Sequence, residues 1–398
     1  MKNFDAKSKN TGNAGGTAMD FLPDDFPDDF PDDQSLTEAL EEYTKQDLLD
    51  IARLHGFSGY SKYRKKSELA CFVAENMLLP SHMERFFLNA ADEEIALFEK
   101  SMAESVSFSG FDSDMDGIAV FAEGAYCFIR FAFEVYVPSD VAAAYRLIST
   151  PAFHKKRKRH NLLSRYIVAA VNLYGIVPVE TLMEIFNDRN KQKCTVDEFF
   201  DVFTDLSYWN EDVAYYQGAF VADLLLASDD PDTCEPIFES LLEDQGDKPF
   251  FVPGNDAFLL YSDVLFPLAN LEVLRLHDFL VNEFLYGEDD ATDICEFSAL
   301  GLRAGIAIKD AFNYIAHPER LPDERIGEQK GDELLAILID VWNNTRMLAN
   351  RGYTPLEMDA LSGENGETWD SYLILPREEA RKNKAAGKVV PFDKNRKK

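Results

Sequence analysis

Four cationic side chains and two tyrosines lie within seven consecutive positions, 60 to 66, at the start of a predicted helix. They are Tyr60, Lys62, Tyr63, Arg64, Lys65 and Lys66. Lysine and arginine neutralise backbone phosphates, and an aromatic ring stacks on an exposed base. The cluster therefore predicts a contact with nucleic acid. A second interpretation stays open, in which the two tyrosines pack in a small core and the basic residues are only solvated, since nearby glutamates offset their charge.

The densest basic run of the chain extends from His154 to His160 and reads His-Lys-Lys-Arg-Lys-Arg-His. It directly precedes a predicted helix at Leu162–Leu173. In that position Arg157 and Lys158 would hold a nucleic-acid backbone as a secondary contact. The alternatives are a solvated linker between domains and a partner for the acidic N-terminal segment of the chain.

One acidic stretch satisfies the sequence pattern of a calcium-binding loop. Its carboxylates are Asp112, Asp114, Asp116 and Glu123. The context argues against binding, because Ser105–Gly110 is a poor entering helix, Ala119 replaces the usual branched residue, and no second hand is visible. We therefore predict an acidic turn and no metal site.

The sequence contains none of the local motifs that mark common catalytic sites. The patterns G-x-S-x-G, H-E-x-x-H and G-x-G-x-x-G are missing, no cysteine and histidine form a recognisable nucleophile pair, and the six histidines are dispersed. We predict a protein that is not an enzyme and that needs no cofactor.

The elements that would position the first basic cluster are three short helices in residues 35–80. Ser35 and Glu38 have the spacing of a capping box, and Thr44 is placed to cap a second helix. That helix ends at His55-Gly56, where glycine suits a left-handed cap. A third helix is predicted from Lys65 to Leu79.

The stretch from Thr44 to Leu69 combines a leucine-rich helix, the sequence Gly-Phe-Ser-Gly-Tyr-Ser-Lys and basic residues before Glu-Leu. In this pattern residues 36–79 resemble the N-terminal domain of transcription termination factor Rho, and they are similar to related helix-extended-helix modules of the SAP type. The resemblance implies a three-helix module that works with nucleic acid. The RNA-binding OB fold and the Walker loop that follow this domain in Rho are not visible here; the chain lacks G-x-x-x-x-G-K-[ST].

The middle of the chain is predicted to form two further parts. Residues 81–157 form a helical segment, with helices at Met83–Ser105 and Pro138–Ile148 on either side of the apolar stretch Ile118–Val137. Residues 158–260 form a winged-helix-like unit of three helices and a trailing hairpin.

The three helices of this predicted unit are Leu162–Leu173, Val179–Asn187 and Val196–Leu206, and its hairpin is Tyr208–Val221. The third helix would read the groove in a DNA-binding winged helix. Because that helix carries Asp197, Glu198, Asp201 and Asp205, we predict a packing or partner role for the unit and no DNA reading.

Residues 261–361 are predicted to form a C-terminal helical domain. Trp342-Asn-Asn-Thr-Arg346 with Gly352-Tyr-Thr-Pro-Leu-Glu357 resembles the helical part of uncharacterised bacterial proteins that end in a cysteine-rich SEC-C zinc motif. That motif is absent here, so no zinc site is implied. Residues 362–398 form a predicted basic, flexible tail, with nine basic residues against three acidic ones from Arg377 onward.

Composition bounds the function classes. The formal charge is −31, from 40 basic and 71 acidic residues, and a field of that sign repels phosphate unless positive charge is concentrated locally. The five cysteines form no C-x-x-C pair and are odd in number, which is typical of free thiols in a reducing compartment. Glu123, Arg130 and Glu134 interrupt the most apolar stretch, so we predict a cytoplasmic protein with no membrane contact.

Residues 1–34 contain the repeated unit Phe-Pro-Asp-Asp and are predicted to be a disordered acidic tail. Either the tail only solvates the chain, or Phe21, Phe26 and Phe30 dock on a protein partner.

Together these features predict a mainly α, multi-domain protein. The function that we expect is that of a non-enzymatic accessory protein of bacterial transcription, related to termination, or of RNA metabolism, which binds RNA or DNA weakly through the Rho-like module. The alternative is a protein–protein adaptor with no affinity for nucleic acid.

Overall fold

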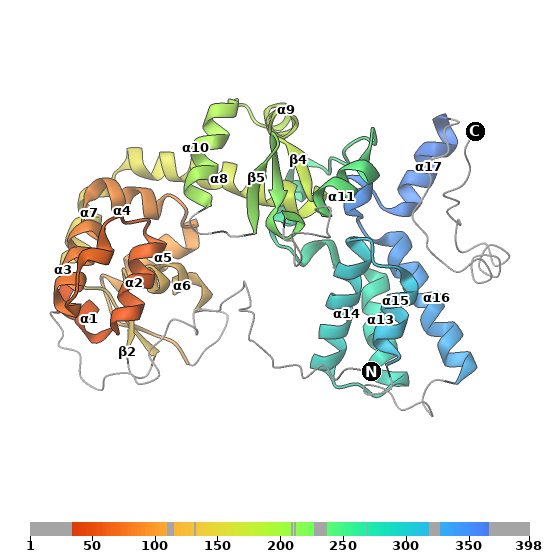
Figure 1. Cartoon of the computed structure of the whole chain (residues 1–398), viewed down its shortest axis with the longest axis horizontal. Coiled ribbons are helices and arrows are strands. Elements are labelled where there is room, and N and C mark those ends of the chain that lie inside the picture. Colours follow the sequence, from red (N-terminus) through yellow and green to blue (C-terminus); the bar gives the residue numbers. More distant parts are fainter. Residues whose placement is uncertain are drawn as a thin grey trace. The chain divides into compact units, whose positions relative to one another are not determined.

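The computed structural model describes residues 34–109, 115–130, 133–207, 210, 212–226, 237–268, 270–317 and 327–365. The protein is mainly helical, as the sequence predicts (Figure 1). Its contacts divide the chain into two compact units. Unit 1 comprises Met1–Ser164 and Asp197–Asp212, and unit 2 comprises Arg165–Val196 and Val213–Lys398.

Unit 1 begins with the three helices predicted for the Rho-like module, α1 (Leu36–Glu42), α2 (Lys45–Leu54) and α3 (Lys66–Met77). Both predicted N-caps are confirmed, since the hydroxyls of Ser35 and Thr44 accept the backbone N–H of Glu38 and Asp47, and both caps are complete capping boxes. Gly56 takes the left-handed conformation predicted for the end of α2, with φ of +65°.

The remaining helices of unit 1 are α4 (Pro80–Phe87), α5 (Asp92–Ser101), α6 (Asp116–Glu123), α7 (Ser139–Ile148), the first part of α8 (Pro151–Tyr174) and α10 (Val196–Leu206). The short strands β1 (Val106–Ser107), β2 (Phe128–Arg130) and β3 (Glu134–Tyr136) form an antiparallel sheet in the order β1-β3-β2. One core joins the module to the elements after it, because Leu40, Val73, Phe87, Phe98 and Tyr126 all lie in a single buried cluster.

Two predictions for this region are wrong. The helix predicted at Met83–Ser105 is two helices, α4 and α5, because the chain turns at Leu88 to Ala91 and Glu94 caps α5 by accepting the backbone N–H of Ala91. The basic run His154–His160 does not precede a helix as a linker would. It lies inside α8, which begins at Pro151.

Unit 2 contains a second antiparallel sheet, of β4 (Ile176–Pro178), β6 (Ala219–Ala222) and β5 (Val213–Tyr216), in the order β4-β6-β5. With α8, α9 (Val179–Arg189) and α10, the sequence of elements is helix, strand, helix, helix and hairpin, which is the order of a winged helix. The hairpin predicted within Tyr208–Val221 is therefore present as β5 and β6. Almost all of α10 is grouped with unit 1, however, so the range 158–260 is divided between the units.

The rest of unit 2 is helical. It contains α11 (Ile237–Gln245), α12 (Asn255–Phe258), α13 (Leu271–Glu283), α14 (Glu288–Arg303), α15 (Ile308–Ile315), α16 (Glu328–Asn344), α17 (Pro355–Asn365) and the 3-10 turns η4 (Asp223–Leu226), η5 (Leu259–Ser262), η6 (Phe266–Leu268) and η8 (Leu348–Asn350). Helices α13 to α16 surround one apolar cluster that includes Leu276, Leu302, Leu338 and Trp342 (Figure 1).

The motif Trp342–Glu357 is a structural junction of unit 2. The Arg346 guanidinium contacts the Glu357 carboxylate, donates to the carbonyl oxygen of Gly352 at 3.1 Å, and lies 3.6 Å from the centre of the Phe251 ring. Glu357 also accepts the backbone N–H of Thr354 at the start of α17. These contacts tie α17 to the turn after α16, which gives the sequence pattern a structural reason.

Candidate nucleic-acid interface

The first basic cluster lies on the connection between α2 and α3 of unit 1. Gly56 and Gly59 take left-handed conformations there, and a 3-10 turn, η2, spans Tyr60–Lys62. The side chains of Lys62, Arg64, Lys65 and Lys66 are all exposed. The fold therefore brings the four predicted cations together on the surface of the module.

The two tyrosines of the cluster have a different environment. Tyr60 and Tyr63 are half-buried and pack against the core of unit 1. The Tyr63 ring lies 4.9 Å from the Phe72 ring, and the Lys62 ammonium lies 4.9 Å from the centre of the Tyr63 ring. These contacts fit the packing interpretation of the tyrosines. Any contact of this cluster with nucleic acid would then be made by the cations to the phosphate backbone.

The polar contacts of the cations leave most of their charge uncompensated. Lys65 is 3.2 Å from Glu68, both side chains being largely exposed, and such a pair contributes little. The Lys66 ammonium donates to the carbonyl oxygen of Glu41 at 2.5 Å, which uses one of its three N–H groups. Among the described residues, Lys62 and Arg64 have no carboxylate partner within ion-pair distance.

Most of the second basic run, on α8, is paired with carboxylates within unit 1. Arg157 is buried, and its guanidinium contacts the Asp92 carboxylate and donates to the carbonyl oxygen of Ala90 at 2.5 Å. The side-chain hydrogen bond from Arg157 is the main reason why the pKa of Asp92 is lowered. A buried side chain cannot reach a phosphate, which removes Arg157 from the predicted backbone contacts and gives it a packing role.

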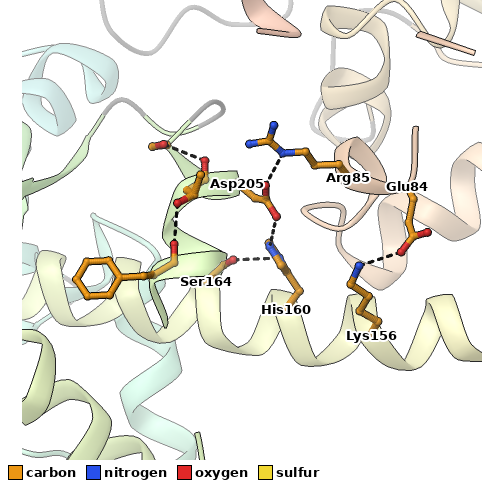
Figure 2. Close-up of polar contacts among 9 residues, drawn as sticks. Glu84, Arg85, Lys156, His160, Ser164 and Asp205 are labelled. Carbon is orange, nitrogen blue, oxygen red and sulfur yellow. Dashed lines mark hydrogen bonds and ion pairs between the residues drawn. The ribbon is translucent and has the colours of Figure 1, made fainter. Parts of the chain in front are cut away.

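The neighbours of Arg157 on α8 are also paired with acidic side chains. Lys158 is exposed but lies 3.2 Å from Asp92. Lys156 donates to Glu84 at 2.9 Å (Figure 2). Arg159 forms a two-pronged contact with Glu198 of α10, at 2.8 and 3.0 Å. The density of positive charge that makes this run prominent in the sequence therefore serves internal contacts.

Asp205 of α10 is the centre of a small polar network in unit 1. One carboxylate oxygen accepts a hydrogen bond from Arg85 at 2.5 Å, and the other lies 3.4 Å from Nε2 of His160, whose Nδ1 is 3.5 Å from the Ser164 hydroxyl (Figure 2). Burial alone would raise the pKa of Asp205, but the hydrogen bonds with His160 and Arg85 outweigh it and lower that pKa. The carboxylate is thus held in its charged form.

The acidic character predicted for α10 is present on its outer face. Asp197 and Asp201 are exposed, while Glu198 and Asp205 are committed to the contacts with Arg159 and Arg85. A helix with this surface repels DNA phosphates. The geometry is that of the packing role expected from the sequence.

A histidine pair, with His55 buried and His82 half-buried, was missed by the sequence interpretation. Nε2 of His55 lies 2.9 Å from the carbonyl oxygen of Gly124, so it carries the proton and donates, and Nδ1 then accepts from Nε2 of His82 at 2.8 Å. Burial lowers the pKa of His55 to about 3 and that of His82 to about 4. The local sequence signals only the end of α2 at His55; nothing in it marks the burial of the imidazole.

The structure describes no metal site. No group of three or more histidine, cysteine, aspartate or glutamate side chains is arranged to hold a metal ion within the described residues. Of the carboxylates in the predicted acidic turn, Asp116 and Glu123 lie at the two ends of α6, but Asp112 and Asp114 lie outside the described residues. The same holds for the acidic repeats before residue 34 and for the basic tail after residue 365.

Four of the five cysteines, Cys71, Cys127, Cys194 and Cys295, lie in the described residues, and none of them forms a disulfide there. None of the helices described here has both the length and the apolarity required to cross a bilayer.

Comparisons with known proteins give no relative. No protein family model, no curated protein and no solved structure matches the chain.

Proposed function

We propose that the protein is a non-enzymatic accessory factor of bacterial transcription, related to termination, or of RNA metabolism, and that the cluster Lys62, Arg64, Lys65 and Lys66 holds the nucleic-acid backbone. Two lines support the proposal. One is the resemblance of residues 36–79 to the N-terminal domain of Rho. The other is the surface cluster itself.

The observation that carries the proposal is the contrast between the two basic clusters. In the basic run of α8, the four consecutive cations from Lys156 to Arg159 are paired with Glu84, Asp92 and Glu198. The cations of the module are exposed, and only Lys65 has a carboxylate partner among the described residues. In a chain with a net charge of −31, a site for phosphate requires locally uncompensated positive charge, and this cluster provides it.

The proposal is tested by fluorescence anisotropy of the full chain with labelled single-stranded RNA, single-stranded DNA and duplex DNA over a range of salt concentrations. Four phosphate contacts predict a plot of log K against log salt with a slope of roughly −3 for a single strand. Replacing Lys62, Arg64, Lys65 and Lys66 with alanine should remove the binding and the salt dependence together.

A matched control has the same change in charge at another place. Lys155, Lys156, Lys158 and Lys191 are exposed, and their replacement with alanine should leave the salt slope unchanged. Equal losses in the two variants would show a general effect of net charge and would contradict a site on the module. So would a native chain that binds none of the three nucleic acids.

A second candidate function is that of a protein–protein adaptor. The observation that favours it is the exposed acidic surface of α10, at Asp197 and Asp201, which suits a basic protein partner and repels nucleic acid. Two variants distinguish the two functions. An adaptor would keep its partner when Lys62, Arg64, Lys65 and Lys66 are replaced with alanine. It would lose its partner when Asp197 and Asp201 are replaced with asparagine.

A further inference from the structure

Unit 2 has an apolar groove between α14 and α15. It has a volume of about 230 Å³ and is lined by the side chains of Phe297, Ile306, Ala311 and Tyr314 together with Gly301. Phe297 is 50% exposed and Ile306 is 42% exposed. The ring of Phe297 is stacked on Tyr314 at 4.2 Å. The stacked rings of Phe297 and Tyr314 thus lie beside an open cavity.

A buried hydroxyl in the same groove has no partner among the described residues. Ser298 is only 2% exposed and lines the groove, and its Oγ makes no hydrogen bond within that part of the chain. A serine in a helix usually bonds to the carbonyl of the preceding turn, and a buried hydroxyl without a partner is unfavourable. A segment that enters the groove would supply a backbone group to this hydroxyl.

Acidic side chains border the apolar part of the groove. Asp310 lies at its edge and is exposed. A neighbouring cavity of about 620 Å³ shares Tyr314 with the groove and adds Asp290 and Asp293, which are also exposed. This surface suits a segment that has a bulky apolar side chain between positive charges.

The chain contains such a segment outside the described residues. Residues 388–398 read Lys-Val-Val-Pro-Phe-Asp-Lys-Asn-Arg-Lys-Lys, with five basic residues against one acidic residue. Lys388 follows Asn365, the end of α17, by 23 residues. Such a length spans up to about 80 Å. Because α17 packs on α16 and α16 packs on α15, the groove is about 20 Å from α17 across two helix spacings.

We propose that residues 388–398 dock in this groove of the same chain, with Phe392 inserted beside Phe297 and Tyr314 and the lysines next to Asp293 and Asp310. This proposal does not depend on the nucleic-acid interface of unit 1. Because residues 388–398 are tethered to the groove by the same chain, their effective concentration sets the fraction of molecules in which the groove is filled. With an effective concentration of roughly 1 mM and an intrinsic Kd of about 100 µM, about nine molecules in ten would have the groove filled.

The first measurement is hydrogen exchange of the full chain and of its Phe392→Asp variant. Amides in residues 297–315 should exchange about 10-fold faster in the variant, since an open groove loses the protection given by about 90% occupancy. Leu375→Asp is the matched control, because it places the same charge in the same undescribed part of the chain, and it should leave the exchange unchanged.

The second measurement is the binding of a labelled peptide of residues 386–398, followed by anisotropy. The Phe392→Asp chain should bind it at least about 10-fold more tightly than the native chain, whose groove is already filled. Adding Ile306→Asp to the Phe392→Asp chain should abolish this binding.

Three outcomes would overturn the proposal. One is unchanged exchange in the Phe392→Asp chain. The second is equal binding of the peptide by the native and Phe392→Asp chains, or binding by neither. The third is protection that disappears on dilution together with a change from dimer to monomer, which would assign the groove to a second copy of the chain.

Discussion

Arg85 of α4 donates a hydrogen bond of 2.5 Å to Asp205 of α10, although 120 positions separate the two residues. The contact explains why α10 is grouped with unit 1 while the sheet that follows it belongs to unit 2. His160 also contacts the same carboxylate. About two helical turns earlier in α10, the pair of Glu198 with Arg159 adds a second link to unit 1.

Removing the Asp205 carboxylate should therefore destabilise unit 1. Asp205→Asn keeps the shape but loses the charge, which leaves the Arg85 guanidinium without its anion, and we expect a loss of about 1–3 kcal/mol in the free energy of unfolding. Asp201→Asn is the matched control. Asp201 is exposed on the same helix, so its replacement should cost no more than about 0.5 kcal/mol. Urea unfolding of both variants measures the difference, and equal values would refute a structural role for the Asp205 network.

The pair of His55 and His82 predicts a specific dependence on pH. Both folded pKa values, about 3 for His55 and about 4 for His82, lie below the unfolded value of about 6.5. The unfolded chain then binds more protons in this range, so stability is fully present above pH 6.5 and falls as the pH decreases toward 4. The loss due to His55 should reach about 2 kcal/mol near pH 5.

Hydrogen exchange of the peptides that cover α2 and α6 measures this loss locally. After correction for the intrinsic pH dependence of amide exchange, the protection factors of His55→Asn should depend much less on pH between 6.5 and 5 than those of the native protein do. His154→Asn changes a half-buried histidine outside the pair and should keep the native pH dependence. A native chain whose protection factors do not change across this window would contradict the assignment of two neutral imidazoles at His55 and His82.

The sequence predicted the local structure of unit 1 better than its contacts. Caps depend on neighbours three residues apart, so Ser35 with Glu38 and Thr44 with Asp47 were readable, and so was the left-handed Gly56. The pairing of Arg157 with Asp92 was not readable, because 65 residues separate them and nothing local distinguishes a buried arginine from a solvated one.

The candidate site shows the same limit. Clusters at positions 60–66 and 154–160 look alike in the sequence, as runs of lysine and arginine. They differ only in whether carboxylates from distant helices reach them, as Glu84, Asp92 and Glu198 reach α8. The groove of unit 2 also has no sequence signature, since Phe297 lies in α14 among apolar residues that are mostly buried and Ile306 lies in the turn after that helix.

Two arginines of unit 2 predict opposite effects of the same substitution. Arg303 is buried, its terminal nitrogens have no hydrogen-bond partner in the part of the chain that the structure describes, and burial lowers its pKa to about 10. Arg346 contacts Glu357, Gly352 and Phe251. Arg303→Met should raise the melting temperature by about 2–4 °C, because it removes an unpaired buried charge worth at least about 1 kcal/mol. Arg346→Met should lower the melting temperature by a similar or larger amount.

Differential scanning calorimetry of the two variants is the test. Methionine has a length close to that of the arginine stem, so the comparison isolates the guanidinium group and its partners. A fall in melting temperature for Arg303→Met as large as that for Arg346→Met would show that the Arg303 guanidinium stabilises the fold, and the prediction would be wrong.

Gly352 combines two requirements that can be separated. Its φ is +85°, and a Cβ at this position would lie 3.0 Å from the Leu173 side chain and 3.2 Å from the Tyr174 ring. Gly305 has a φ of +101°, but a Cβ there would meet nothing within 4 Å. Gly305→Ala should therefore cost only the backbone strain of about 1–2 kcal/mol, whereas Gly352→Ala should cost about 1 kcal/mol or more beyond that, because both neighbours are buried and cannot move freely.

Urea unfolding of Gly305→Ala and Gly352→Ala gives the two losses, and their difference measures the close approach of the turn after η8 to the end of α8. The additional change Leu173→Ala provides the decisive comparison. It removes the side-chain atoms nearest to the new Cβ, so the cost of Gly352→Ala should fall toward that of Gly305→Ala in this background. If Gly352→Ala costs the same with and without Leu173, backbone strain alone selects glycine at this turn.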